Sequence, residues 1–143
     1  MKKLLVSIIF FSICFEVYAE PTEPLVIKKS NKYTSVSNLP IREECSEDNL
    51  KIKMSGVITA RDFEDDHLSI NSFILEQSKG NRSTINVNLM DVARSWGVAG
   101  TSNVIPALQE LLKIQRHVNV VVYKTLGKKP SCQKDFYYLY GVQ

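Results

Sequence analysis

The sequence contains few of the side chains that catalysis and metal binding use most often. It has two histidines and three cysteines in 143 residues, and it lacks the G-x-S-x-G, H-E-x-x-H and glycine-rich phosphate-loop motifs. His67 lies in a predicted turn and His117 at a predicted helix end, so no metal-binding spacing forms around them. We therefore expect a protein that is not an enzyme and that binds no metal or other cofactor.

A strong excess of one charge is also absent. The chain has 18 basic and 15 acidic side chains, a formal net charge of +3, and no basic patch with interleaved aromatic residues. These features argue against nucleic acid or an anionic membrane as the main partner. Asp62, Glu64, Asp65 and Asp66 gather in one stretch, but they lack the regular spacing of a calcium-binding loop, so we interpret them as a solvated turn.

The apolar run at the start of the chain, residues 4–15, is too short to cross a membrane, which takes about 20 residues. Two lysines precede this run, and V-Y-A follows it, ending at Ala19 in the pattern of a signal-peptidase site. A lipoprotein signal ending at Cys14 is disfavoured because a bulky isoleucine precedes that cysteine. We predict a signal peptide over residues 1–19, export to the periplasm or beyond, and no transmembrane segment in the mature protein.

Removal of the signal peptide changes the number of cysteines in the mature chain. Cys14 leaves with the signal peptide, and Cys45 and Cys132 remain. An even pair in an exported chain predicts one disulfide bond, and two unpaired thiols are the alternative. Because the loop is long, chain entropy predicts a stabilisation of about 4–5 kcal/mol. The mature chain of residues 20–143 is long enough for one domain and not for two.

Alternating apolar residues predict most of the secondary structure. Residues 20–49 form an N-terminal extension that is polar and rich in turns, with a short strand or hairpin in it, and residues 50–143 form the main domain. The predicted strands of that domain begin near residue 50 and cover residues 67–76, 84–89, 118–123 and 135–142. One helix is predicted between the third and fourth of these strands.

The first strand of the main domain contains the pair Ser55-Gly56. Ile52 and Met54 set the apolar side, which places Ser55 on the side away from the core. At Gly56 the alternation slips to Val57, and glycine at such a slip is typical of a bulge or a strong bend. Parity alone makes Ser55 an exposed serine beside an open backbone, which is ordinary surface in most proteins.

The helix is predicted from one apolar stripe and from its first turn. Val104, Leu108, Leu111 and Leu112 follow helical spacing. Ser102 or Asn103 can cap the helix, which would place Pro106 in the first turn, where its missing amide has no partner in any case. Trp96 precedes the helix, and we interpret it as a cover over one end of the core in preference to a ring that stacks on a ligand.

Five strands with one helix between the third and the fourth are the connectivity of the OB fold. We therefore predict a mainly β protein with one helix (α+β), built as a small OB-fold-like five-stranded antiparallel barrel. Closing the barrel would also remove the exposed strand edges that invite aggregation.

Four stretches then resemble a known family. They are M-S-G-V-I-T-A-R-D-F, D-D-H-L-S-I-N-S-F-I-L-E-Q, S-T-I-N-V-N-L-M-D-V-A-R-S-W-G and F-Y-Y-L-Y-G-V, within residues 53–143. Together they resemble the B subunits of subtilase cytotoxin and typhoid toxin, which are the binding subunits of bacterial AB5 toxins. The resemblance implies an OB-fold subunit that forms a pentamer, binds sialylated or related cell-surface glycans as its receptor, and delivers a toxic A subunit.

The resemblance also implies a set of glycan-binding residues. Ser55 matches the family serine that hydrogen-bonds the sugar near the start of the first barrel strand. Glu76 or Gln77 matches a polar residue late in the second strand, and Tyr123 lies within one place of a tyrosine at the end of the fourth strand.

The chain departs from this family at its cysteines and at its N-terminus. Ile74 and Asn88 lie at or near the positions of family cysteines, and the N-terminal segment is longer here. The remaining pair, Cys45 and Cys132, resembles instead the bridge of the cholera-like B subunits. An alternative hypothesis is a periplasmic protein–protein module, such as an inhibitor, an immunity protein or a secretion accessory, that uses the same small barrel.

Overall fold

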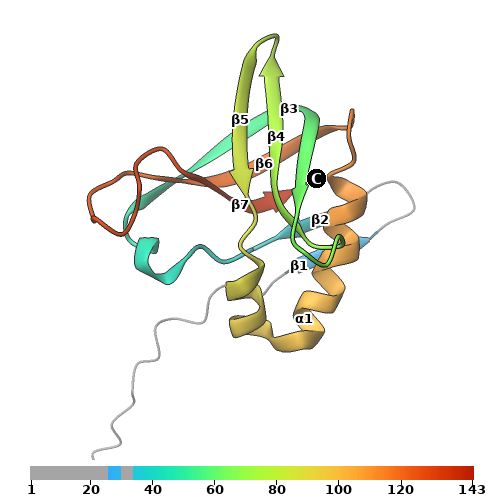
Figure 1. Cartoon of the computed structure of the whole chain (residues 1–143), viewed down its shortest axis with the longest axis horizontal. Coiled ribbons are helices and arrows are strands. Elements are labelled where there is room, and N and C mark those ends of the chain that lie inside the picture. Colours follow the sequence, from blue (N-terminus) through green and yellow to red (C-terminus); the bar gives the residue numbers. More distant parts are fainter. Residues whose placement is uncertain (1–25, 30–33) are drawn as a thin grey trace, which may run out of the picture.

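The computed structural model describes residues 26–29 and 34–143, and the predicted signal peptide lies outside them. The elements are β1 (Val26–Lys29), β2 (Thr34–Ser37), a short 3-10 helix η1 (Glu43–Cys45), β3 (Asn49–Phe63), β4 (Ile70–Ser78), β5 (Asn81–Asn86), α1 (Leu89–Leu111), β6 (His117–Thr125) and β7 (Tyr137–Val142). The described part of the chain is therefore mainly β with one α-helix, as predicted. Figure 1 shows the β4–β5 hairpin projecting from one end of the molecule, with α1 and the β1–β2 hairpin at the other end.

Five strands are joined in a closed ring of pairings. Strand β3 pairs with β6 along its first half and with β4 along its second half, β4 pairs with β5, and β6 pairs with β7, all antiparallel. The ring is completed by β5 and β7, which run parallel and share two residue pairs, Ile85 with Tyr137 and Asn86 with Tyr138. The expectation of an entirely antiparallel sheet is therefore wrong at this one pairing, because a closed ring of five strands cannot alternate in direction at every pairing.

Strand β3 is long and bends in its second half. Its register with β4 shifts between Ile58 and Ala60 and again between Asp62 and Phe63. The bulge predicted at Ser55-Gly56 is absent from the β3–β6 register, which runs without a shift from Asn49 to Val57. Instead Gly56 continues the buried face, and a Cβ on it would meet the backbone carbonyl carbon of Glu76 at 2.8 Å. Glycine is needed there because the backbone of β4 passes too close for a side chain.

Helix α1 begins earlier than predicted and contains a kink. It starts at Leu89, and Gly97 interrupts it with φ 70° and ψ −168°. Pro106 therefore lies inside the second segment and not in a first turn. The predicted apolar stripe of Val104, Leu108, Leu111 and Leu112 is confirmed, since all four are buried. Burial of this stripe holds the second segment in place despite the backbone hydrogen bond that proline removes.

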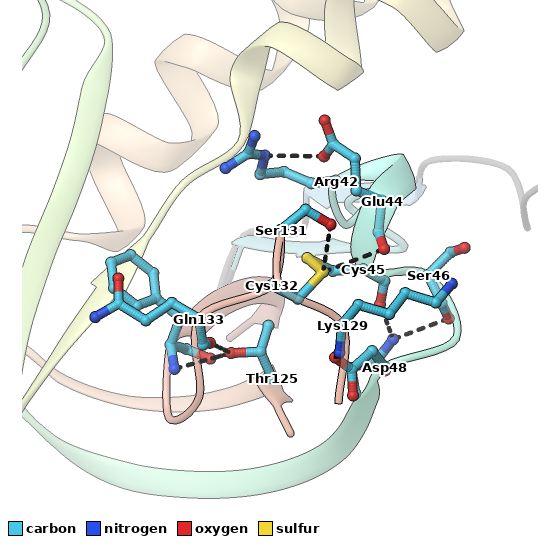
Figure 2. The surroundings of a disulfide bond; sticks show 12 residues. Arg42, Glu44, Cys45, Ser46, Asp48, Thr125, Lys129, Ser131, Cys132 and Gln133 are labelled. Carbon is cyan, nitrogen blue, oxygen red and sulfur yellow. Dashed lines mark hydrogen bonds and ion pairs between the residues drawn. A yellow bond between two sulfur atoms is a disulfide. The ribbon is translucent and has the colours of Figure 1, made fainter. Parts of the chain in front are cut away.

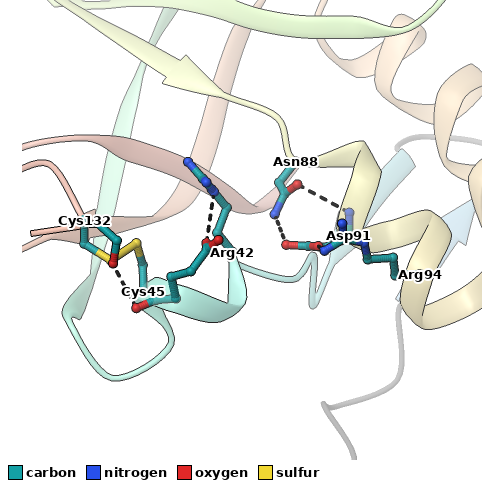
Figure 3. Close-up of polar contacts among 8 residues, drawn as sticks. Arg42, Cys45, Asn88, Asp91, Arg94 and Cys132 are labelled. Atoms are coloured by element: carbon teal, nitrogen blue, oxygen red, sulfur yellow. Dashed lines mark hydrogen bonds and ion pairs between the residues drawn. A yellow bond between two sulfur atoms is a disulfide. The ribbon is translucent and has the colours of Figure 1, made fainter. Parts of the chain in front are cut away.

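The first turn of α1 is capped by the residue that precedes it. The Asn88 side-chain oxygen accepts a hydrogen bond from the Asp91 backbone N–H at 3.4 Å, and Asn88 Nδ2 donates to Asp91 Oδ2 at 2.6 Å (Figure 3). Arg94 Nη1 lies 3.4 Å from Asp91 Oδ1. The carboxylate of Asp91 lies where the helix dipole favours negative charge. These contacts explain why the helix begins here and why Val92 in this turn reaches the core.

The N-terminal hairpin joins the same sheet. Strands β1 and β2 pair with each other, and β2 pairs with β7 through Val36 and Val142. Val36 is fully buried, and Ile27 is packed against the core. The backbone N–H of Leu39 donates to the carbonyl of Tyr140 at 2.9 Å and extends this contact. The hairpin thus carries core residues on one face and exposes its other face on the outside of the sheet.

The predicted disulfide between Cys45 and Cys132 is present, with an S–S distance of 2.09 Å and a sequence separation of 87 residues. It ties η1 to the loop between β6 and β7 (Figure 2). Buried Asp48 holds the same loop, because the backbone N–H of Lys129 donates to Asp48 Oδ2 at 2.9 Å and that of Leu126 donates to the Asp48 carbonyl at 3.1 Å. This loop is therefore fixed by one covalent bond and by hydrogen bonds to one buried acid.

No helix within residues 26–29 and 34–143 has the length and hydrophobicity that crossing a bilayer requires.

Candidate functional site

Ser55 lies on the outer face of β3, as its position in the apolar pattern predicted. Its neighbours Met54 and Gly56 are buried, whereas Ser55 itself is exposed. Ser55 pairs across the strands with Asn119 of β6, and Ser55 Oγ donates a hydrogen bond to Asn119 Oδ1. This contact orients both side chains, and it leaves the Asn119 amide group with two N–H donors for another molecule.

Ser55 begins a row of outward-facing residues that crosses five neighbouring segments. Asn119 exchanges two backbone hydrogen bonds with Gln143, at 2.9 and 3.0 Å. One step along from the Val36–Val142 pair, Ser35 of β2 lies opposite Gln143, and Ser35 pairs with Lys28 of β1. Hydroxyl, amide and ammonium groups therefore follow one another across the outside of the sheet.

A groove with a volume of about 750 Å³ runs over this row. Lys28 and Ser35 lie at its hairpin side, and Lys53, Ser55 and Asn119 lie at its β3–β6 side. Gly141 of β7 lies between the two sides and contributes no side chain, so the floor of the groove stays low there. A site with hydroxyl, amide and aliphatic groups on a shallow floor can hydrogen-bond a ligand that carries many hydroxyls.

Tyr140 of β7 lines the groove and connects it with an aromatic cluster. The rings of Tyr123 and Tyr140 meet edge to face, with centroids 5.2 Å apart, and Lys51 Nζ lies 4.0 Å from the centroid of the Tyr140 ring. The Tyr140 hydroxyl donates to Asn38 Oδ1. Lys51 and Tyr123 are paired across the strands in the same register as Ser55 and Asn119, so Tyr123 shares the outward face with Ser55. Tyr123 therefore supports the edge of the groove through Tyr140.

Glu76 and Gln77 do not line the groove. Glu76 pairs with Val57 across the strands. Its carboxylate forms an ion pair with Arg82, whose Nε lies 2.6 Å from Glu76 Oε2. Gln77 is exposed at the register shift between Glu76 and Ser78. The structure thus brings Ser55 and Tyr123 to one face of the sheet. Glu76 lies on that face near Ser55, because its partner Val57 is two residues from Ser55 along β3, but neither Glu76 nor Gln77 lines the groove.

The acidic stretch forms the turn between β3 and β4. Asp66 accepts hydrogen bonds from the Ser69 hydroxyl at 2.6 Å, the Ser69 N–H at 2.8 Å and the Leu68 N–H at 2.9 Å. These bonds, the Ser69 hydroxyl first, lower the pKa of Asp66 below its ordinary value of 3.8. The Asp66 carboxylate therefore stabilises the turn in which it lies. In the part of the chain that the structure describes, no group of three or more His, Cys, Asp or Glu side chains is placed to hold a metal ion.

Trp96 lies in the first segment of α1, directly before the kink at Gly97, and it is half-buried. Its Cβ lies so close to Gly100 that a side chain at Gly100 would collide with it. Trp96 does not line the groove. The tryptophan packs on its own helix across the kink.

Several residues of the groove were not predicted from the sequence. Asn119 could have been found by the parity that found Ser55, because Val118 and Val120 on either side are buried. Lys53 is likewise two residues from Ser55 on the same face. The sequence gives no comparable indication for Lys28 and Ser35. Their position depends on how the β1–β2 hairpin pairs with β7, and these two segments lie near opposite ends of the sequence.

Comparisons with known proteins give no match: no protein-family model, no curated protein and no solved structure matches this chain. The resemblance to AB5 toxin B subunits therefore stays a prediction that depends on the short stretches quoted above.

Proposed function

We propose that the protein is an exported, non-catalytic binding module that recognises cell-surface glycans through the groove beside Ser55. The observation that carries the proposal is the outward row of Ser55, Asn119 and Ser35 over a shallow groove with Tyr140 at its side. Sugars offer many hydroxyls and an apolar ring face, so a site with polar donors, acceptors and an aromatic ring suits them. The sialylated or related glycans implied by the AB5 resemblance are the first candidates.

We further propose that the five-strand ring is a small OB-type barrel. Its support is the order of elements along the chain, with α1 between the third and fourth ring strands, and the short β5–β7 contact that completes the ring. A five-stranded, partly open barrel of this kind carries oligosaccharide sites in other proteins.

The proposal includes assembly of several copies, with the pentamer of AB5 toxins as the specific expectation and an A subunit as the partner to be delivered. Support comes from two exposed apolar side chains of α1, Met90 in its first turn, 68% exposed, and Val98 directly after the kink, 83% exposed. Side chains of this kind are common at contacts between proteins. Several copies would multiply a weak single-site affinity through avidity, which makes a shallow groove useful.

A glycan array with wild-type protein and the Ser55→Ala variant tests the proposal. Loss of the Ser55 hydroxyl should lower the signal on bound glycans about 3- to 10-fold, which is what one hydrogen bond contributes. Ser78→Ala is the matched control, because Ser78 is exposed on β4 and does not line the groove. Absence of glycan binding by the wild-type protein would reject the proposal.

The alternative function is a periplasmic protein–protein module, and the same exposed pair, Met90 and Val98, favours it. A stoichiometric protein partner that is captured from periplasm by wild type and lost with Val98→Asp, together with no binding on the glycan array, would support this alternative. Light scattering on the purified protein separates self-assembly from contact with another protein.

A further inference from the structure

We infer that the β1–β2 hairpin forms a second subsite of the groove, in which Lys28 binds an acidic group that lies distant from the unit held at Ser55. The inference rests on the proposed function, since it concerns the same groove. It adds the chemical class of the ligand, which is an elongated oligosaccharide that carries a carboxylate or a sulfate, and it gives the N-terminal hairpin a direct part in binding.

The row geometry separates the two subsites. Between Ser55 and Lys28 lie Asn119, Gln143 and Ser35, each on the next segment across the sheet. Neighbouring strands are about 4.8 Å apart, so four spacings place the two ends about 19 Å from each other along the sheet. A single sugar ring held at Ser55 does not reach Lys28, whereas an extended chain of several units spans the row.

The charge of the groove selects the ligand class. Lys28 and Lys53 both line the groove, and among the described residues that line it the one acidic group is the α-carboxylate of Gln143. Both lysines are exposed, so their ammonium groups are hydrated and can exchange water for an anionic group on a ligand. Two cations stand against one carboxylate, so the described lining keeps a net positive charge and favours acidic saccharides over neutral ones.

The position of Lys28 is fixed by the core on the other face of the hairpin. Ile27, its neighbour, packs against the core, and fully buried Val36 pairs with Ile27 across the hairpin. Alternation along β1 then directs Lys28 outward, on the same side as its pair Ser35. The hairpin therefore presents Lys28 from a packed scaffold, which lowers the entropy lost when a ligand binds.

The test compares wild-type protein with Lys28→Gln on one array. The array carries neutral, sialylated and sulfated oligosaccharides, each in a short form of two units and a long form of four to six. Lys28→Gln should lower binding of the long acidic forms about 3- to 10-fold, as expected for one charge-assisted hydrogen bond. It should leave short and neutral forms unchanged. Lys79→Gln is the control, because Lys79 is exposed at the β4–β5 turn, outside the groove.

The sialylated and sulfated glycans on the array distinguish the two acidic groups that Lys28 could bind. Loss on sialylated forms alone identifies a carboxylate as the bound group, and loss on sulfated forms alone identifies a sulfate. If Ser55→Ala weakens binding while Lys28→Gln changes nothing, or if Lys28→Gln weakens short and long forms equally, the second subsite is rejected and the groove at Ser55 stands. If wild-type protein binds no glycan, the proposed function and this inference both fail.

Discussion

Ser55 on β3 and Asn119 on β6 are directly paired, and the Ser55 hydroxyl donates a hydrogen bond to the Asn119 side-chain oxygen. Both side chains are exposed, and both line the groove. The pair thus forms a small preorganised unit, in which each side chain fixes the orientation of the other before a ligand arrives.

Because the two side chains act together, their substitutions should not be additive in binding. We expect Ser55→Ala and Asn119→Ala each to weaken glycan binding about 3- to 10-fold, and the double variant to be little weaker than either single one. Unfolding free energies should stay within about 0.5 kcal/mol of wild type, since both positions are on the surface. Calorimetric titration and urea unfolding of the four proteins give the two quantities. Fully additive losses in binding would indicate that the two residues contact the ligand independently.

A side chain at Gly56 should destabilise the fold. A Cβ at this position would lie 2.8 Å from the carbonyl carbon of Glu76, and the backbone of a neighbouring strand cannot move aside easily. We expect Gly56→Ala to lower the free energy of unfolding by about 1–3 kcal/mol or more. Ser55→Ala, one residue away and directed outward, is the matched control in urea unfolding. A Gly56→Ala variant as stable as wild type would show that β3 and β4 do not approach so closely.

The disulfide should contribute a large part of the stability. Its 87-residue separation predicts that Cys45→Ala/Cys132→Ala lowers the free energy of unfolding by about 4–5 kcal/mol on the chain-entropy model. Wild-type protein unfolded in a thiol reductant should match the double variant, because both lack the same crosslink. A loss below about 1 kcal/mol in urea unfolding would mean that the bridge adds little to a loop that Asp48 already holds.

The turn at Asp66 should become less stable in acid. Its pKa is lowered in the folded protein, so the ionised carboxylate stabilises the fold above the unfolded-state pKa, near 3.8, and this contribution is lost as the pH falls through the folded-state pKa. Asp66→Asn mimics the protonated form at every pH. The difference in melting temperature between wild type and Asp66→Asn should therefore be largest at neutral pH and should shrink below about pH 3.8.

Asp65→Asn is the control for this experiment, because Asp65 is exposed in the same turn. A gap between wild type and Asp66→Asn that is constant from neutral pH to pH 2 would assign the effect to side-chain shape and not to charge.

The spacing of apolar residues along the sequence predicted which side chains of the strands and of the helix are buried. The alternation of β3 and β6 placed Ser55 outward, and the stripe of α1 identified its buried residues. Cysteine arithmetic and the signal-peptide pattern together predicted the Cys45–Cys132 bridge. For the strands and the helix, residues close in the sequence carry this information, whereas the bridge was predicted from the number of cysteines left after export.

The errors came from contacts between distant segments. The need for glycine at position 56 depends on the nearby backbone of β4, and the parallel β5–β7 pairing follows from the closure of a ring of five strands. The early start of α1 was missed because Gly97 interrupts the helical pattern after its first segment. For the site, Glu76 and Gln77 do not line the groove, although the backbone of Glu76 lies against Gly56, next to Ser55, and their part in binding stays a prediction.

The most direct test of the groove as the binding site is a chemical-shift titration of 15N-labelled protein with the glycan that gives the strongest array signal. The largest amide shifts should fall on Ser55, Asn119 and their neighbours along the row toward Lys28. Shifts confined to the β6–β7 loop or to the kink of α1, with the amides of β3 and β6 unmoved, would contradict this prediction.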